Sequence, residues 1–324
     1  MAVEYREREQ TLLIDPQPIA PVQPSRRLIR LGDRVPFGTY LRELWQLRYF
    51  TWLLAVSKAE KANQGQYRTP MWRIVDPFMH KLRMILMFTL LITDRDSQNA
   101  MSFLVVGLFM WDLWEGFITH SLRVMKSNKS LLSAHSFPTA IIVISSALSH
   151  VINDRYKLIV TTFIVLISGI FPNMQPIFPT LNWLAVVPIF FLLIIWGLGA
   201  ACIAARLGIY FPHIHKFLTI PFMFLRVASG VMFNPDRFLP IFGPTVMYLI
   251  QQLPGATFVY LLRSVILQDP MFPPSTRMWI LSAFWAVLTF IVGIIVFWQN
   301  DQNYGRDARQ LTEERERITV DEFD

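Results

Sequence analysis

Long apolar segments alternate with short polar ones along most of the chain. Six of these segments approach or exceed the roughly 20 residues that a helix needs to cross a bilayer. They cover residues 74–93, 100–119, 137–171, 183–206, 216–233 and 278–298. This pattern predicts an all-α membrane protein with six spans.

The third apolar segment is interrupted by the polar string NDRYK at 153–157. A continuous helix over the whole segment would be about 50 Å long, so the segment is either one projecting helix or two short spans. The basic residues favour one helix and six spans. Residues 1–73 hold 12 Lys and Arg against 7 Asp and Glu, and cytoplasmic segments of membrane proteins carry such an excess. Both termini are therefore expected in the cytoplasm.

Two apolar segments do not fit the pattern of simple spans. Residues 38–58 place Trp45 and other large side chains among charged ones, which predicts an amphipathic helix in the cytoplasmic interface. Residues 239–274 are apolar but are broken by Pro240 and Pro254, among others. Each half is too short to span, so we expect a re-entrant hairpin on the outer side, shielded from lipid.

The two ends of the chain are polar. Residues 1–36 are rich in Pro and Arg, which predicts a flexible cytoplasmic N-terminus. Residues 301–324 form a charged cytoplasmic tail. One transmembrane domain over residues 37–300 is therefore expected.

Composition supports a membrane protein and removes several other classes. The chain of 324 residues is 53% hydrophobic and 16% charged, whereas soluble domains are about one quarter charged. Its net charge of +7 lies beside apolar segments, so lipid headgroups explain it better than nucleic acid. Cys202 is the single cysteine, so neither a disulfide nor a cysteine metal site is expected.

Charged residues enter the first span on one helical face. Arg73, Asp76, His80 and Arg83 are spaced 3, 4 and 3 residues apart, which places them within an arc of about 80° on a helix. Lys81 lies beside this stripe. Ionisable side chains inside a membrane are costly and usually face the bundle interior or a water-filled cavity.

The second span offers partners for this stripe. Asp112 and Glu115 are three residues apart, and an antiparallel second span brings Arg83 to the depth of Asp112 and His80 to that of Glu115. One interpretation is therefore an ion-pair ladder that only stabilises the bundle, with contacts of about 0.6 kcal/mol each.

Several strings carry a resemblance to a known family. In chain order they are YLRELWQLRYF (40–50), MWRIVDP (71–77), SNKSLLSAHSFPTAIIVIS (127–145) and RVASGVMFNPDRFLP (226–240). Together they resemble the permease subunits of ABC-2 type polysaccharide exporters, which export O-antigen, teichoic acid or galactan. The resemblance covers about residues 38–300, although the first span of that family is usually apolar where this chain has MHKLR.

The resemblance implies an ABC-2 (type V exporter) transmembrane domain, present as a homodimer bound to two copies of a separate ATPase. ATP and Mg²⁺ belong to that ATPase, in agreement with the lack of a G-x-x-x-x-G-K-[ST] string in this chain. It also implies a coupling helix over about residues 123–135, docked on the ATPase. The residues themselves are compatible with a short basic helix that has Ser127 as its N-cap, and the alternative is an ordinary basic cytoplasmic loop. The candidate coupling residues are Arg123, Lys126, Ser127, Asn128 and Lys129.

The resemblance adds a functional interpretation of the charged stripe. Family substrates are polysaccharides on a polyprenyl diphosphate, and the first and fifth spans form the wall of the conduit. Cations on these spans would offset the desolvation of the diphosphate, and a carboxylate can hold a cation until the diphosphate competes for it. Both interpretations remain open for His80, Lys81, Arg83, Asp112, Glu115 and Arg226.

Tryptophan residues inside the spans have two interpretations. They can stack on passing sugar rings, or they can face lipid and anchor the helices at the interface, which is the commoner arrangement. The residues concerned are Trp111, Trp114, Trp183, Trp196 and Trp285.

Two other classes of protein act on lipid-linked glycans. A membrane-embedded glycosyltransferase or polymerase would need a carboxylate site on a sizeable loop, whereas the outer loop near Asp236 and Asp269 is short and mainly apolar. An ion-coupled transporter would be expected to show inverted repeats, and the sequence shows none.

Overall fold

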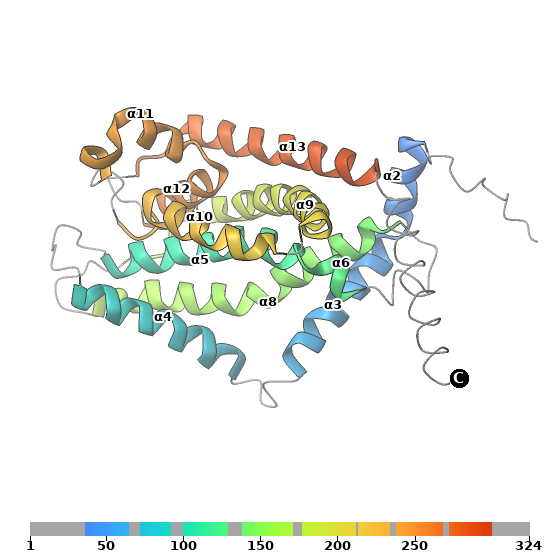
Figure 1. The fold of residues 1–324 in the computed structure, drawn as a ribbon. Helices are drawn as coiled ribbons and strands as arrows, with labels where there is room; N and C mark the ends of the chain where they lie inside the picture. The colour runs from blue at the N-terminus through green and yellow to red at the C-terminus, as the bar shows by residue number, and fades with distance from the viewer. Residues whose placement is uncertain are drawn as a thin grey trace, which may run out of the picture. The chain divides into compact units, whose positions relative to one another are not determined.

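The computed structural model describes residues 36–64, 72–91, 100–128, 138–170, 177–211, 213–233, 238–267 and 272–299. These residues belong to one compact unit, Val35–Asp324. Throughout the described ranges the regular secondary structure is helical (Figure 1). The all-α class predicted from the sequence is therefore confirmed.

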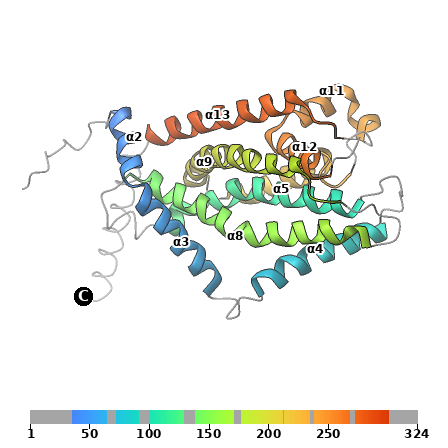
Figure 2. The same cartoon turned by 180° about the vertical axis from the view of Figure 1, so that it is seen from behind.

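Helix α5 (Ala100–Ser121) forms the centre of the bundle. Its residues are apolar almost all round, and a helix of this kind is stable where it is surrounded by others. It packs against several helices, seen from both sides in Figures 1 and 2: α8 (Ala140–Ile167), α9 (Val186–Tyr210), α12 (Pro254–Ile266), α4 (Trp72–Leu91) and α10 (Ile214–Ala228).

Helix α13 (Thr276–Trp298) lies along α9 with their backbones in contact. A Cβ atom on Gly293 would lie 2.3 Å from the carbonyl oxygen of Gly199, and one on Gly199 would lie 2.3 Å from that of Thr289. Small residues allow helices in a membrane to approach this closely. The opposite face of α13 exposes large apolar side chains such as Ile280 and Phe284, as expected of a face in contact with lipid.

Three helical segments are long and apolar enough to cross a membrane: Met101–Ser121, Leu181–Tyr210 and Thr276–Trp298. The second joins the 3₁₀ turn η2 (Leu181–Ala185) to α9. Among the other described helices, α4 and α8 carry several charged residues, and α10 has 15 residues, or about 22 Å. The six predicted spans are therefore not all confirmed.

Helix α8 answers the question that the sequence left open. It runs without a break over 28 residues and ends in the 3₁₀ turn η1 (Ser168–Ile170). The string NDRYK lies inside it, and Lys157 Nζ lies 2.9 Å from a carboxylate oxygen of Asp154. This local pair satisfies the charges, so the polar string does not interrupt the helix.

The amphipathic segment forms two helices rather than one. Helix α2 (Phe37–Gln46) is followed by α3 (Arg48–Gln64), and the chain breaks from helical geometry at Leu47. Trp45, Tyr49 and Trp52 are each more than half exposed. Aromatic side chains of this kind are typical of helices in a membrane interface.

Helix α3 is attached to α8 by a half-buried amino group. Lys58 Nζ donates hydrogen bonds to the carbonyl oxygen of Ile142 (3.1 Å) and to Oγ of Ser145 (3.0 Å). Ala55 and Ala59 are fully buried on the same helix. Burial lowers the pKa of Lys58 to about 8, because a charged amino group is poorly solvated there.

Helices α11 (Leu239–Gln251) and α12 are bent by 80° relative to each other. Pro254 begins α12, where a missing N–H costs nothing. Gly243 has φ +75° inside α11, a conformation that glycine adopts without strain. A bent pair of short helices is either a broken span or a re-entrant hairpin, so the hairpin remains a prediction.

A fully buried arginine connects three segments near this bend. Arg263 of α12 donates hydrogen bonds to the carbonyl oxygens of Gly230 (2.5 Å), Val231 (2.6 Å) and Phe103 (2.9 Å), and its guanidinium lies 3.5 Å from the centre of the Phe103 ring. The sequence did not single out Arg263. It nevertheless holds the string SGV, with Gly230 at φ +82°, against α5 and α12.

The peripheral helices lie at two ends of the bundle. Helices α2 and α6 (Val124–Ser127) lie at one end of the long helices, and α11 lies at the other (Figures 1 and 2). The segments predicted to be cytoplasmic are thus separated from the predicted outer segment. Which end faces the cytoplasm remains a prediction.

Candidate functional site

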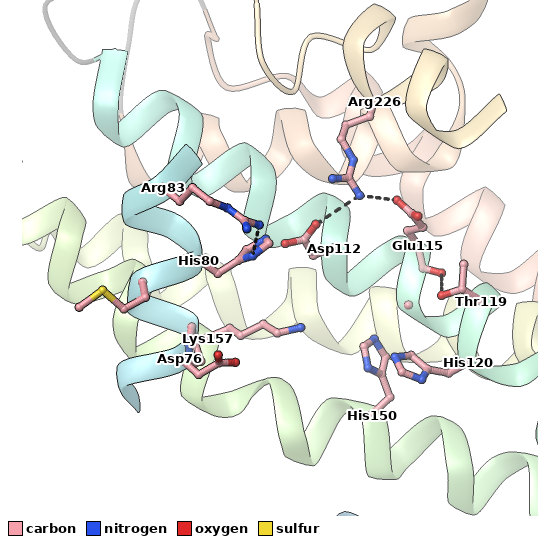
Figure 3. Close-up of a pocket in the computed structure, with 13 residues that line it drawn as sticks. Asp76, His80, Arg83, Asp112, Glu115, Thr119, His120, His150, Lys157 and Arg226 are labelled. Carbon is pink, nitrogen blue, oxygen red and sulfur yellow. Dashed lines mark hydrogen bonds and ion pairs between the residues drawn. The ribbon is translucent and has the colours of Figure 1, made fainter. Parts of the chain in front are cut away.

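A polar pocket of about 680 Å³ lies between α4, α5, α8 and α10. Figure 3 shows its labelled side chains converging from these helices. Five of the six predicted substrate-path residues line it. The backbone of the sixth, Lys81, lies in α4, but its side chain is outside the described part of the structure. The five are His80, Arg83, Asp112, Glu115 and Arg226.

Arg226 is the residue that connects α10 to α5 across the pocket. Its Nη2 lies 2.6 Å from Oε2 of Glu115 and 3.4 Å from Oδ1 of Asp112. Asp112 and Glu115 come together because they are one helical turn apart on α5. The three side chains are each about one fifth exposed. The cluster is therefore well shielded but open to the pocket (Figure 3).

This pairing changes the ion-pair ladder that the sequence suggested. The ladder placed Arg83 beside Asp112 and His80 beside Glu115, both from α4. The two carboxylates form ion pairs with Arg226 of α10, which the ladder did not include, and Arg83 donates a hydrogen bond to Nδ1 of His80 (3.1 Å). Residue spacing gives the face of a helix, but it does not determine which neighbouring helix meets that face.

Buried tryptophans orient one carboxylate of the pocket. Trp111 Nε1 donates a hydrogen bond to Oε2 of Glu115 (2.8 Å), and the Trp111 ring contacts Trp114, which stacks on Trp196 at 5.1 Å. These three tryptophans are less than 10% exposed. The interpretation that these three face lipid is wrong, because α5, α9 and α12 enclose them.

The far side of the pocket consists of His120, His150 and Lys157, which the sequence did not assign to the site. The rings of His120 and His150 lie 4.7 Å apart. His150 is buried, with Nε2 3.3 Å from the carbonyl oxygen of Leu113 and Nδ1 3.8 Å from Asp154. Intramembrane histidine and lysine in SHVINDRYK were a usable signal, but the helix packing was needed to connect them with α4 and α10.

The predicted coupling residues lie around the short helix α6. Arg123, Lys126, Ser127 and Asn128 are described, whereas Lys129 and residues 129–137 lie outside the described ranges. Ser127 is the last residue of α6 and not its N-cap. Its hydroxyl and the Asn128 amide both donate to the carbonyl oxygen of Val124 (3.1 and 2.8 Å), so this pair closes the end of the helix.

Comparison with curated proteins finds two relatives of the same kind, both named O-antigen export system permease protein RfbA, from Klebsiella pneumoniae. One is 22% identical over 179 residues, which cover 55% of this chain and 66% of the relative. The other is 21% identical over 209 residues, which cover 63% and 77%. The chain thus spans just under two thirds of the first relative. A comparison with models of known protein families gives no match.

The relatives agree with the strings in the sequence and with the helical structure. Long apolar helices and permease relatives together indicate a multi-pass inner-membrane protein. The resemblance that the strings suggested is therefore confirmed. This chain is similar to permeases of bacterial O-antigen export systems, which are polysaccharide exporters of the ABC-2 type.

Proposed function

We propose that this chain is the transmembrane permease subunit of an ATP-binding cassette exporter that moves a polyprenyl-diphosphate-linked polysaccharide of the O-antigen, galactan or teichoic-acid type. Two copies of the chain act with two copies of a separate ATPase, which binds ATP and Mg²⁺. The chain itself makes and breaks no covalent bond. It provides the path through the membrane and the contacts to the ATPase.

The observation that carries this proposal is the state of Arg226 in the pocket. A guanidinium from α10 is held by two carboxylates of α5 inside a bundle of apolar helices. Arginine binds phosphate oxygens through two parallel N–H donors. A diphosphate that enters the pocket competes with Asp112 and Glu115 for those donors, and Arg83 lies on the opposite helix of the same pocket.

The pairing also provides a way to couple substrate binding to helix movement. While Arg226 is paired with Glu115, α10 is held to α5. A diphosphate that takes over Arg226 weakens this connection, so α10 can move away from α5 and open the pocket towards lipid. ATP-driven closure of the ATPase, passed through the segment around α6, then moves the substrate onward.

Glycan export by cells carrying single variants tests the proposal. In the native host, Arg83→Gln and Arg226→Gln should each reduce the surface polysaccharide and raise the cellular pool of its lipid-linked precursor. Arg277→Gln is the control, because Arg277 is exposed on α13 and contacts Tyr248 and Gln252 away from the pocket. Normal export by both pocket variants, present in the membrane at wild-type amounts, would contradict the proposal.

The same cells test the partner. Purification of the wild-type chain in mild detergent should recover an ATPase in equal amount, in a particle with two copies of each. The pocket variants should retain that ATPase, because Arg83 and Arg226 lie on α4 and α10 and not in the segment around α6. Recovery of the chain with glycan-synthesis enzymes and without an ATPase would instead support a transferase.

A further inference from the structure

The described charged side chains in and directly behind the pocket carry no excess of positive charge before any substrate arrives. Among the described residues that line it, three permanent cations face three carboxylates. Arg226 is paired with two of these carboxylates, and Lys157 is paired with Asp154 behind the pocket wall. The three cations are Arg83, Lys157 and Arg226, and the three carboxylates are Asp76, Asp112 and Glu115.

An entering diphosphate therefore brings negative charge into a site that has no excess of positive charge to offset it. In a medium of low dielectric constant this negative charge is costly, and a carboxylate displaced from Arg226 loses that cation. Uptake of a proton by the pocket lowers the negative charge by one unit. Histidine is the side chain that gains a proton most readily near neutral pH, and three histidines line this pocket: His80, His120 and His150.

His150 is placed to accept this proton. Its Nε2 faces the carbonyl oxygen of Leu113 (3.3 Å) and its Nδ1 faces the carboxylate of Asp154 (3.8 Å). A neutral imidazole can donate its one N–H to the Leu113 carbonyl oxygen, whereas an imidazolium can make this hydrogen bond and also attract the Asp154 carboxylate by its charge. The ring also lies directly against α5, because a Cβ atom on Gly116 would lie 2.1 Å from Nε2.

His120 adds a second acceptor for the proton next to His150. Its ring is tilted against the His150 ring, with the centres 4.7 Å apart, and it lies at the exposed end of α5. A proton shared by the pair avoids the repulsion of two adjacent imidazolium ions. Figure 3 shows the two rings next to each other on one side of the pocket.

The charges around the pair act in both directions. Burial of both rings opposes a positive charge on them most strongly, and Lys157 on α8 and Arg123 after the end of α5 add to this opposition. Asp154 on α8 and Asp112 on α5 favour a positive charge there. An anion in the pocket also favours a positive charge on the two rings, so its arrival favours the protonated form of the histidine pair.

We propose that His120 and His150 form a proton-binding half of the pocket, so that an anionic diphosphate binds together with a proton. The inference rests on the proposed function, because it assumes that the pocket takes a diphosphate. It predicts that affinity falls as pH rises, by about tenfold per pH unit for one linked proton.

Calorimetric titration of farnesyl diphosphate into the full chain in lipid nanodiscs tests the proposal. Titrations at about pH 7.5, just above the usual range of histidine, in two buffers with different heats of ionisation give the number of protons taken up. Wild type should take up about one proton more per ligand than His150→Gln. The protonation of the ligand itself is common to both proteins and cancels in this difference.

Two further variants keep the result interpretable. His120→Gln changes the more exposed of the two rings, and it should also lower the proton uptake. His213→Gln alters an exposed histidine at the start of α10, outside the pocket, and should leave the uptake at the wild-type value. Equal proton uptake by wild type and both pocket variants, with binding retained, would overturn the inference alone. Lack of binding by wild type would overturn the proposed function as well.

Discussion

Arg226 and Glu115 meet at 2.6 Å across the pocket, although they are 111 residues apart in the chain. Trp111 donates a second hydrogen bond to the same carboxylate oxygen. The contact joins α10 to α5, which otherwise touch over a short length. The contact holds the two helices together, and it is also where an anionic substrate would compete with Glu115 for Arg226. Variants must therefore separate these two roles.

Charge-matched variants separate the roles of the Arg226 cluster. Arg226→Gln leaves Asp112 and Glu115 without their cation, and we expect a loss of stability of about 1–3 kcal/mol. The triple variant Arg226→Gln, Asp112→Asn, Glu115→Gln removes all three charges, so it should recover most of that stability. Thermal unfolding in detergent measures both proteins.

Export by the same variants gives the second readout. Both the single and the triple variant should fail to export, because neither offers a cation from α10 to the diphosphate. Recovery of export together with stability in the triple variant would show that the cluster only holds the bundle together.

Arg263 should contribute more to stability than Arg277, which is an exposed arginine on the adjacent helix α13. Arg263→Leu leaves three buried carbonyl oxygens without their donor, and each such group costs about 1–3 kcal/mol. We therefore expect a protein that folds poorly or unfolds at a clearly lower temperature. Arg277→Leu is the matched control, since Arg277 is exposed, and it should change the unfolding temperature little. Equal effects of the two variants would contradict the assigned role.

The close contact between glycines of α9 and α13 predicts that a glycine-to-alanine change lowers stability there but not at an open position. Gly293→Ala places a Cβ atom 2.3 Å from the carbonyl oxygen of Gly199, so the helices must separate and lose packing. We expect a loss of about 1–3 kcal/mol, measured by thermal unfolding. Gly38→Ala is the control, because nothing lies within 4 Å of its Cβ position and alanine favours helix. A Gly293→Ala protein as stable as wild type would show that the two helices do not touch.

Lys58 predicts a specific pH dependence of stability. Its pKa is about 8 in the folded protein and 10.5 in an ordinary environment. The unfolded chain thus binds more protons between these values, and stability rises with pH in this window, by at most about 1.4 kcal/mol per pH unit. Below about pH 8 the burial of the charged amine opposes folding in full.

Comparison with Lys58→Met isolates this effect from other groups that titrate at alkaline pH. The stability of wild type relative to the variant should increase from about pH 8 towards pH 10.5. A constant difference over this range would mean that the amine is well solvated, and the contact between α3 and α8 would then have another basis.

The sequence predicted the helical class and most of the pocket because both depend on local patterns. Apolar runs placed α5, α9 and α13, and the cost of charge in a membrane singled out Arg83, Asp112 and Arg226. The partners of these charges depend on which helices are adjacent. That depends on packing across the whole bundle, so Arg226 was predicted as a site residue but its pairing with Glu115 was not.

Other differences have equally specific causes. Trp111 and Trp196 were expected at lipid because tryptophan is common there, yet their neighbours on α5 and α9 enclose them. Arg263 stands alone in the apolar string VYLLRSVIL, and a single charge in such a run was a usable signal. Its three acceptors come from Phe103 and from the segment at Gly230, which no local pattern connects to α12.

Photo-crosslinking from inside the pocket is the most direct measurement. A photoreactive amino acid at Thr119, which lines the pocket, should form an adduct with the lipid-linked polysaccharide in cells whose ATPase is inactive. The same probe at Phe191, which is exposed on α9, should not. Adduct from Thr119 that disappears with Arg226→Gln is the expected result. Absence of glycan adduct from Thr119, or equal adduct from both positions, would contradict a substrate path through this pocket.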